Sequence, residues 1–387
     1  MRDKIFIVVV AFILLFFPIC SFMRPEKDIS TAENRSLFKK SDIKLLSLND
    51  DLNSFLQDQF FCGERIKKVY NIGKNKVINV SMKLIEKTNM MELIPMGNKI
   101  FRLANSDYLV YRPKTVDEKK DTIIQVIQSI NDLSDKHENI KFYFYNNVTD
   151  STVNSKKEFD DFIINNLNDD IPYLSSTTIN SYDDYKRCFY KTDHHWNKNG
   201  QYEGYTDIVN LLEIENPLEI TGTHKFEGIK FYGSKDRAVG NYDIYDDFEV
   251  NLYNYPDMKV EIDNKEVDDY GKSNDFFAGN IPEGNVEENY YGDFYGWDDG
   301  IIKIKVDGND EKDNLVIFSN SYSNPLNKLI ASSFNETYII DLRNYEKELG
   351  EEFDVDKFFD EHKIDRVLIL ANYNYYTDED SIIKIGE

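Results

Sequence analysis

The tetrapeptide Asp193-His194-His195-Trp196 places two of the chain's five histidines beside a carboxylate. Histidine exchanges protons readily near neutral pH, and a carboxylate that fixes its tautomer makes it a better base. On an extended strand the Cα atoms of Asp193 and His195 would lie about 6.6 Å apart on one face, with His194 on the other. The spacing therefore predicts His195 as a general base that Asp193 orients, with His194 packed behind the pair.

Ser321 is the candidate nucleophile. It lies in a serine-rich turn, 319–325, that follows a predicted buried strand over 314–318. In parallel α/β sheets, sites form at the carboxyl ends of the strands. With Pro325 as the first helical residue, the Ser321 hydroxyl would lie near free backbone N–H groups that stabilise an oxyanion. The alternative is that the serines of this turn only cap the helix, and the Asp-x-His pair is what favours the catalytic interpretation.

A divalent metal site is the nearest competing interpretation of the same motif. Asp193, His194, His195 and His224 are residue types that bind such ions. Adjacent histidines on a strand point to opposite faces, so only one of His194 and His195 would join Asp193. We therefore expect no metal and no other cofactor.

Buried apolar runs alternate with amphipathic segments through most of the chain after residue 120. The expected strands cover 140–145, 188–190, 314–318, 337–342 and 366–371. The expected helices cover 121–136, 159–167, 199–212, 325–334 and 355–362. This alternation is typical of a parallel sheet covered by helices, so the predicted fold class is α/β.

Two stretches depart from that alternation. Residues 24–110 are predicted to be a polar linker followed by helices, with apolar residues at helical spacing over 45–60 and 66–72. Residues 221–300 contain short alternating runs, such as 248–255, broken by glycine, proline and Asp-Asn pairs. Such runs are typical of β-hairpins, and we predict a β-rich insertion there.

Residues 5–23 carry no charge. As a helix they would be about 28 Å long, close to the roughly 30 Å hydrocarbon core of a bilayer. A signal-peptide core is usually shorter and ends in small residues, whereas this one ends Pro18-Ile-Cys-Ser-Phe22. We therefore predict a single-pass cell-membrane anchor over 1–24, with the C-terminal part outside the cytoplasm. A cleaved signal, including a lipoprotein cleaved before Cys20, is the alternative, and basic residues on both flanks leave the orientation signal weak.

Composition narrows the class of partner. The 387 residues are 41% hydrophobic and 30% charged, as in globular proteins, and the net charge of −24 excludes nucleic acid as an expected partner.

The cysteines and the clusters of like residues leave alternatives. Cys62 and Cys188 could form one disulfide or remain two thiols. Aromatic clusters at 290–297 and 373–376 are candidates for a sugar-stacking surface or for ordinary core. The acidic runs 243–249 and 307–313 are expected to be solvated loops, with calcium binding as the alternative.

The sequence resembles the DHHW family of bacterial cell-envelope proteins, which is related to the SGNH-hydrolase-like alginate acetylation proteins AlgX and AlgJ. The Thr192–Trp196 block is the most specific match. The other matching blocks, in chain order, are Glu33-Asn34-Arg35, Asp58-Gln59-Phe60, Gly233-Ser234, Phe277-Ala278-Gly279-Asn280, Asn320-Ser321-Tyr322-Ser323-Asn324 and Ile339-Ile-Asp341-Leu342-Arg343. The resemblance implies an SGNH-hydrolase-like, flavodoxin-like domain over 111–387.

The resemblance also implies roles for individual residues. Ser321 would be the nucleophile, His195 the base and Asp193 its orienting residue. Around them, the resemblance and the neighbouring positions indicate an oxyanion pocket or supporting contacts from Gly279, Asn280, Tyr322, His194 and Trp196. The sequence departs from the usual SGNH pattern at two points: one residue separates Asp193 from His195 where SGNH enzymes usually have two, and Asn320 stands where Asp usually precedes the serine.

The expected function is a serine-dependent O-acetyltransferase or acetyl esterase that acts on an exported or cell-surface polysaccharide. A membrane-bound O-acyltransferase is the implied protein partner. The alternative is a non-catalytic glycan-binding or assembly factor of the cell envelope on the same fold. The expected organisation is an anchor over 1–24, a helical lead-in over 25–110 and the hydrolase-like domain over 111–387.

Overall fold

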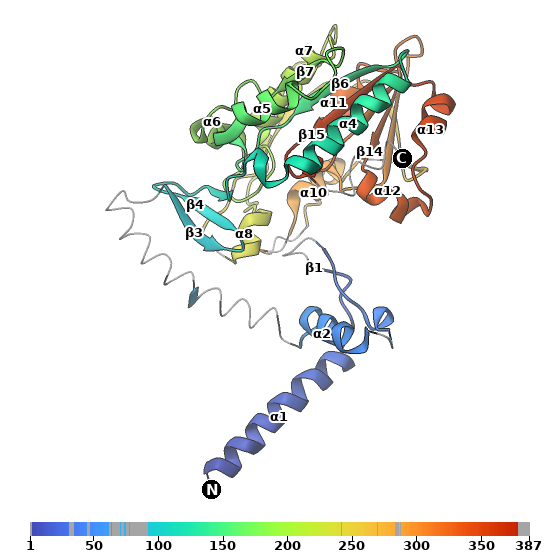
Figure 1. Cartoon of the computed structure of the whole chain (residues 1–387). Helices are drawn as coiled ribbons and strands as arrows, with labels where there is room; N and C mark the ends of the chain where they lie inside the picture. The colour runs from blue at the N-terminus through green and yellow to red at the C-terminus, as the bar shows by residue number, and fades with distance from the viewer. Residues whose placement is uncertain are drawn as a thin grey trace.

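The computed structural model describes residues 2–30, 35–44, 47–61, 63, 70, 73–74, 77, 92–240, 242–268, 270–282, 286 and 288–377 (Figure 1). The helices are α1 Arg2–Met23, α2 Leu48–Asp58, α4 Lys120–Lys136, α5 Lys156–Ile164, α6 Tyr182–Cys188, α7 Lys198–Leu211, α8 Ser234–Val239, α9 Ser273–Phe277, α10 Tyr290–Tyr295, α11 Asn327–Ala331, α12 Leu342–Leu349 and α13 Val355–His362. The strands of the main sheet are β6 Lys141–Asn146, β7 Tyr173–Ser175, β10 Met258–Ile262, β11 Lys265–Val267, β12 Ile301–Val306, β13 Leu315–Phe318, β14 Glu336–Ile340 and β15 Arg366–Ala371. The smaller sheets contain β1 Ile29–Ser30 with β2 Arg35–Ser36, β3 Leu93–Gly97 with β4 Ile100–Leu103 and β5 Leu109–Tyr111, and β8 Gly222–Lys225 with β9 Glu249–Leu252.

Among the described residues the main sheet has eight strands, in the order β11-β10-β12-β14-β13-β15-β6-β7. The five strands from β14 to β7 are parallel, as the sequence predicts. The other three are antiparallel, because β12 pairs with β14 in the opposite direction and β10 and β11 continue as a hairpin. The prediction of a purely parallel sheet was therefore wrong at one edge. Two of the additional strands come from the region predicted to be a separate β-rich insertion.

Helices cover both faces of this sheet (Figure 1). One buried cluster joins α4, α5, α12 and α13 to the sheet, and a second joins α6, α7 and α11 to the other face. Successive residues of a strand point to opposite faces. Val316 and Phe318 of β13 accordingly belong to the first cluster, while Leu315 and Ile317 belong to the second. This double burial explains why β13 is a continuous apolar run.

The carboxyl ends of the parallel strands meet at one edge of the sheet. There Ser319 follows β13 and donates its backbone N–H to the carbonyl of Ile340 at the end of β14. Asn372 follows β15, and Asn147 follows β6 and donates its backbone N–H to Ala371. The sheet therefore presents several polar residues side by side at the edge where sites form in α/β proteins.

The lead-in region differs from its prediction. Helix α2 lies within the predicted segment 45–60, but 66–72 falls almost wholly outside the described residues. Residues 93–111 form a three-stranded antiparallel sheet where helix was expected. The cause is a tight turn in which Gly97, Asn98 and Lys99 all have positive φ, a conformation that ends a helix and reverses a strand.

The N-terminal segment is helical along its backbone over Arg2–Met23. Within the part of the chain that the structure describes, no helix has both the length and the apolar character that a membrane span requires. The anchor over 1–24 stays a prediction. Cys188 is unpaired and buried, with its thiol donating to Oε2 of Glu203, while Cys62 lies outside the described residues.

Candidate active site

The loop that carries the DHHW residues is not a strand. Helix α6 runs through Cys188, and residues 190–195 form a bent loop closed by an antiparallel bridge between Phe189 and Trp196. The predicted strand at 188–190 was therefore wrong. Asn197 closes the base of the loop, because its Nδ2 donates to the carbonyl of Phe189 at 3.0 Å and its Oδ1 caps α7.

The loop is held by a buried carboxylate from the acidic run 243–249. Asp246 accepts from the backbone N–H groups of Lys191 and Thr192, each at 2.9 Å, and from the Thr192 hydroxyl at 2.6 Å. Asp246 is 5% exposed, so this member of the run is not solvated, contrary to expectation. The backbone N–H of Gly233 donates to the Thr192 hydroxyl oxygen, and a Cβ at Gly233 would lie 2.5 Å from the Asp193 Cα. Glycine is therefore required where this chain segment crosses the loop.

Asp193, His195 and Ser321 form one hydrogen-bonded series. Nδ1 of His195 lies 2.6 Å from Oδ1 of Asp193, and Nε2 of His195 lies 2.9 Å from Oγ of Ser321. The same Asp193 oxygen accepts from the His195 backbone N–H, and the other accepts from the Ser234 N–H at 2.6 Å. Since a carboxylate accepts from Nδ1–H, the neutral imidazole has its lone pair on Nε2, facing the serine. The bend of the loop thus brings the Asp193 carboxylate to Nδ1 of His195 although only one residue separates the two in the sequence.

The electrostatic surroundings keep Asp193 ionised. Burial alone would raise its pKa, but the neighbouring His194 and His195, the hydrogen bond from His195 and the Arg237 charge outweigh burial and hold the pKa well below its ordinary value. A carboxylate that stays charged can hold the His195 tautomer and stabilise an imidazolium when His195 accepts a proton.

His194 does not point away from the pair, as the strand model predicted. Its ring lies against that of His195 with centroids 3.8 Å apart, and its Nδ1 lies 2.6 Å from Oγ of Ser234. Burial, followed by the charges of His195, Lys235 and Arg237, lowers the His194 pKa to about 3. His194 is therefore neutral at physiological pH.

This depressed pKa predicts a specific loss of stability in acid. As pH falls below the ordinary histidine value of 6.5, the unfolded chain binds a proton that folded His194 accepts only near pH 3. The free energy of unfolding should therefore fall progressively between pH 6.5 and about 3. In His194→Asn this fall should be smaller than in the unaltered chain when both are unfolded by urea at several pH values. Equal pH dependence in the two proteins would contradict the assignment.

The turn that carries Ser321 is braced against the histidine loop. The hydroxyl of Tyr322 donates to the carbonyl of His194 at 2.7 Å, and its ring packs edge-on to Trp196 at 6.1 Å. Helix α11 begins at Asn327, two residues later than predicted, because residues 321–326 remain in turns. Tyr322 and Trp196 therefore support the site through packing and hydrogen bonding.

Trp196 fits into a notch on α7. A Cβ at Gly204 would lie 2.7 Å from the indole ring, and one at Gly200 would lie 2.1 Å from the Cys188 carbonyl oxygen. The two glycines, one helical turn apart, allow the indole to become 99% buried beside the loop.

Tyr291 of α10 is a site residue that the sequence prediction missed. Its ring stacks on that of His195 with centroids 3.9 Å apart and an interplanar angle of 10°, and its hydroxyl donates to the Ser321 carbonyl at 3.3 Å. Tyr290, Tyr291 and Phe294 are all buried, so most of this aromatic cluster is core. Tyr373, Tyr375 and Tyr376 are likewise buried, which excludes 373–376 as a stacking surface.

Gly279 and Asn280 do not join this series. Both are exposed in the turn after α9, where the Asn280 N–H donates to the Asp275 carbonyl, and no contact among the described residues links them to Ser321.

Asn372, unlike Gly279 and Asn280, directly follows a parallel strand, β15, at the carboxyl edge of the sheet. The register of β13 and β15 ends with the pair Phe318–Ile369, so Asn372 and the turn that carries Ser321 both follow neighbouring strands at the carboxyl edge. Oδ1 of Asn372 accepts from the Tyr375 N–H at 3.2 Å, and no described residue accepts from Nδ2.

The argument against a metal ion rested on adjacent histidines pointing apart, and that assumption was wrong. Ligand atoms of Asp193, His194 and His195 all lie within 4.8 Å of one another. Nδ1 of His195 and Oδ1 of Asp193 are already joined by a hydrogen bond, which a metal ion would have to break. His224 lies in β8, with its ring against Phe226 and Phe277, and is not part of this group.

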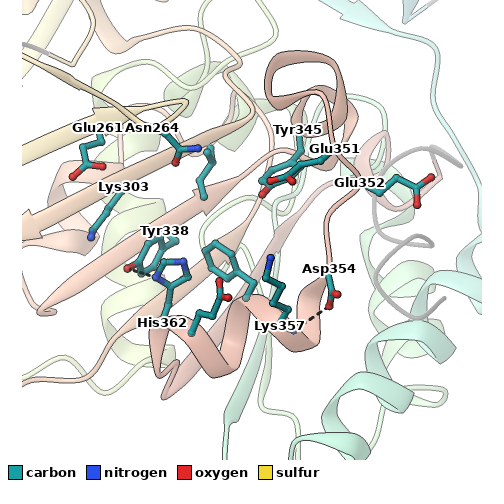
Figure 2. Close-up of a pocket in the computed structure, with 13 residues that line it drawn as sticks. Glu261, Asn264, Lys303, Tyr338, Tyr345, Glu351, Glu352, Asp354, Lys357 and His362 are labelled. Carbon is teal, nitrogen blue, oxygen red and sulfur yellow. Dashed lines mark hydrogen bonds between the residues drawn. The ribbon is translucent and has the colours of Figure 1, made fainter.

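A polar cavity of about 490 Å³ lies at the antiparallel side of the sheet, between β10, β12 and α13 (Figure 2). Figure 2 shows Tyr338 beside His362, and the Tyr338 hydroxyl lies 3.0 Å from Nδ1 of that histidine. Lys303, another lining residue, pairs with Glu336 at 3.1 Å. The cavity contains none of Asp193, His195 and Ser321, and it is separate from the site at the carboxyl edge.

These features define an α/β protein with a buried carboxylate, an imidazole and a hydroxyl in contact at the carboxyl edge of its parallel strands. No protein-family model and no curated protein matches the sequence. Bacillus cereus PatB1, solved with a sulfonyl adduct, has the same fold with a TM-score of 0.56, 18% identity, and coverage of 74% of this chain and 100% of that one.

A DHHW family protein from Eubacterium siraeum aligns with a TM-score of 0.57 and 16% identity over 76% of this chain and 97% of that one. The O-acetyltransferase domain of Pseudomonas putida AlgJ aligns more loosely, with a TM-score of 0.38 and 10% identity over 72% of this chain and 92% of that one. The resemblance to the DHHW family is thus confirmed at the level of the fold.

Proposed function

We propose that this protein is a serine-dependent O-acetyltransferase or acetyl esterase that acts on a polysaccharide outside the cytoplasm. One observation carries the proposal: Oγ of Ser321 lies 2.9 Å from Nε2 of His195, whose Nδ1 lies 2.6 Å from a buried carboxylate. A general base needs to lie within hydrogen-bond reach of the proton that it abstracts, and this pair meets that requirement. The sulfonyl adduct of PatB1 adds support, since sulfonyl groups react with nucleophilic side chains.

In the proposed reaction, the Ser321 hydroxyl attacks the acetyl carbonyl carbon of a donor ester while Nε2 of His195 accepts its proton. Asp193 stabilises the imidazolium that forms. The tetrahedral intermediate then expels the donor alcohol, which takes the proton from His195 and leaves an acetyl ester on Ser321. A sugar hydroxyl, or water, next loses its proton to His195 and attacks that ester. The bond between Oγ of Ser321 and the carbonyl carbon then breaks, Oγ takes the proton from His195, and the acetylated sugar or acetic acid leaves.

Asn372 is the proposed oxyanion donor. It follows β15, the strand beside β13, at the carboxyl edge, and the hydrogen bond from the Tyr375 N–H to its Oδ1 leaves the amide Nδ2 to donate. Removing one such donor typically lowers kcat by about 10²–10³-fold. We expect that loss in Asn372→Ala with acetyl esters, and a small change in Asn344→Ala, which removes an amide near the same edge. An Asn372→Ala enzyme with unaltered kcat would contradict the role.

The proposal also includes location and partner. We propose that residues 1–24 anchor the chain in the cell membrane, on the strength of the uncharged stretch over residues 5–23. An anchored, extracytoplasmic acetyl carrier requires a donor from the membrane side, and a membrane-bound O-acyltransferase has the matching chemistry. Extraction of the full chain into the detergent phase, and its release into the aqueous phase when residues 1–24 are deleted, is the expected result. A full chain that stays aqueous would contradict anchoring.

A non-catalytic glycan-binding factor remains the second candidate, because the fold alone does not require chemistry. The two are separated by supplying the full chain with 4-nitrophenyl acetate and an oligosaccharide acceptor. The proposed enzyme releases nitrophenolate and yields free acetate or an acetylated sugar. A folded chain that releases no nitrophenolate above background and forms no acetylated sugar would favour the binding factor.

A further inference from the structure

An aromatic pocket lies next to the turn that carries Ser321. It has a volume of about 230 Å³ and is bounded by α7, β9, α9, α10 and the start of α11. Asn324 and Pro325, from the Ser321 turn, form part of its wall. Its six aromatic side chains are Tyr253, Tyr255, Tyr270, Phe277, Phe294 and Tyr295.

Two successive ring contacts join this aromatic pocket to the proposed base. Tyr295, in the wall, has its ring centroid 5.0 Å from that of Tyr291, which in turn lies 3.9 Å from that of His195. The amide of Asn324 donates to the Gly296 carbonyl at 3.0 Å, which fixes the Ser321 turn to the end of α10. The pocket is therefore one ring away from His195 and belongs to the same rigid arrangement of elements.

The chemistry of the lining points to a carbohydrate. Tyr255 is 43% exposed and Phe277 is 49% exposed, so their rings are free to stack on the apolar C–H face of a sugar. The amide oxygen of Asn324 remains to accept a hydrogen bond from a sugar hydroxyl, since its Nδ2 is committed to Gly296. Apolar rings with a few placed polar groups are typical of small-ligand sites, and this volume is below the usual 300–1,000 Å³ for larger ligands.

The charge of the lining narrows the class of sugar. The chain has 70 acidic residues, yet none of the described residues that line the aromatic pocket carries a carboxylate, and Lys328 is the charged residue among them. A neutral, N-acetylated or anionic sugar fits this lining, whereas a sugar with a free ammonium group would be repelled. The contrast with the acidic cavity beside α13 is clear, since that cavity is lined by five carboxylates.

We propose that the aromatic pocket binds one pyranose unit of the acceptor glycan, next to the unit whose hydroxyl reacts at Ser321. This inference rests on the proposed function, because it assigns the pocket to the same substrate. Tyr291 lies between the pocket and His195, so the bound unit is the neighbour of the reacting unit and holds the chain in register. Recognition of two successive units would give the protein preference for a polymer over a free monosaccharide.

The test is a binding measurement on the full chain with no ester present. Calorimetry would use oligosaccharides of a neutral glucan, of N-acetylglucosamine and of a uronic acid. We expect at least one to bind, and we expect Tyr255→Ala and Phe277→Ala each to weaken that binding about tenfold. Tyr245→Ala, which removes a ring of 39% exposure outside the pocket, should bind like the unaltered chain. No binding by any of the three sugars, or unaltered binding by both pocket variants, would overturn the inference.

Two further measurements distinguish a failure of the pocket assignment from a failure of the proposed chemistry. Saturation transfer from aromatic protein resonances to sugar ring protons needs no variant, and its absence during binding would also overturn the inference. Nitrophenolate release from 4-nitrophenyl acetate by the unaltered chain reports on Ser321 independently. Ester turnover without glycan binding rejects the pocket assignment alone, while glycan binding without ester turnover rejects the proposed chemistry and leaves the pocket assigned.

Discussion

Acetyl-ester turnover by Ser321→Ala is expected to fall by about 10⁴-fold or more, to the level left by substrate binding and oxyanion donors alone. The substitution removes Oγ of Ser321, the atom that would carry the acetyl group. It also removes the hydrogen bond between this Oγ and Nε2 of His195. The fold should be retained, since that contact is a single hydrogen bond at the edge of the sheet. Initial rates with 4-nitrophenyl acetate, together with thermal unfolding, measure both effects.

Ser323 provides the matched control. Its hydroxyl is buried two residues further along the same turn and donates to the Asn320 carbonyl at 3.2 Å. Ser323→Ala should lose about 1 kcal/mol of stability and keep most of the turnover. If Ser323→Ala lost turnover and Ser321→Ala did not, the nucleophile would be misassigned.

Asp193→Asn is the second substitution with a large expected effect, a fall in kcat of about 10⁴-fold. Asparagine has nearly the same shape, but its NH₂ would face Nδ1–H of His195 and favour the tautomer whose Nε2 carries the proton. That tautomer cannot accept the proton of Ser321. Because the pKa of Asp193 is held well below its ordinary value, the loss should persist at every pH at which the protein is folded.

A surface aspartate gives the comparison for this second prediction. Asp161 is 59% exposed and pairs with Lys157 on α5, so Asp161→Asn should leave kcat unchanged. Rescue of Asp193→Asn at high pH would indicate that a different group sets the tautomer, and it would contradict the role given to Asp193.

The central strands were predictable because their residues are apolar on both faces. Residues 314–318 and 366–371 became β13 and β15 with almost the predicted bounds, and 121–136 became α4. Local patterns failed where long-range contacts decide the conformation. Residues 93–111 form strands because a turn of positive φ reverses them. Strand β12 pairs in the antiparallel direction with β14, which begins 30 residues after β12 ends.

In the site, too, local sequence patterns predict some features and long-range contacts decide the others. The residue types of Asp193, His195 and Ser321, and the place of Ser321 beyond a strand end, could be predicted from the sequence. The bent loop that carries Asp193 and His195 depends on Asp246, more than 50 residues away. The strand model placed His194 on the wrong face because it assumed an extended backbone. Tyr291 and Asn372 were missed, since one is a ring among many aromatic residues and the other becomes informative only through the register of β15 with β13.

The role of Ser321 as nucleophile is tested most directly by treating the folded full chain with phenylmethylsulfonyl fluoride and mapping the adduct by peptide mass spectrometry. We expect one sulfonyl group per chain, on Ser321, formed slowly or not at all in His195→Ala because Nε2 is then absent. A sulfonyl group on another residue, or a folded chain whose Ser321 reacts no faster than Ser323, would show that Ser321 is not the activated nucleophile.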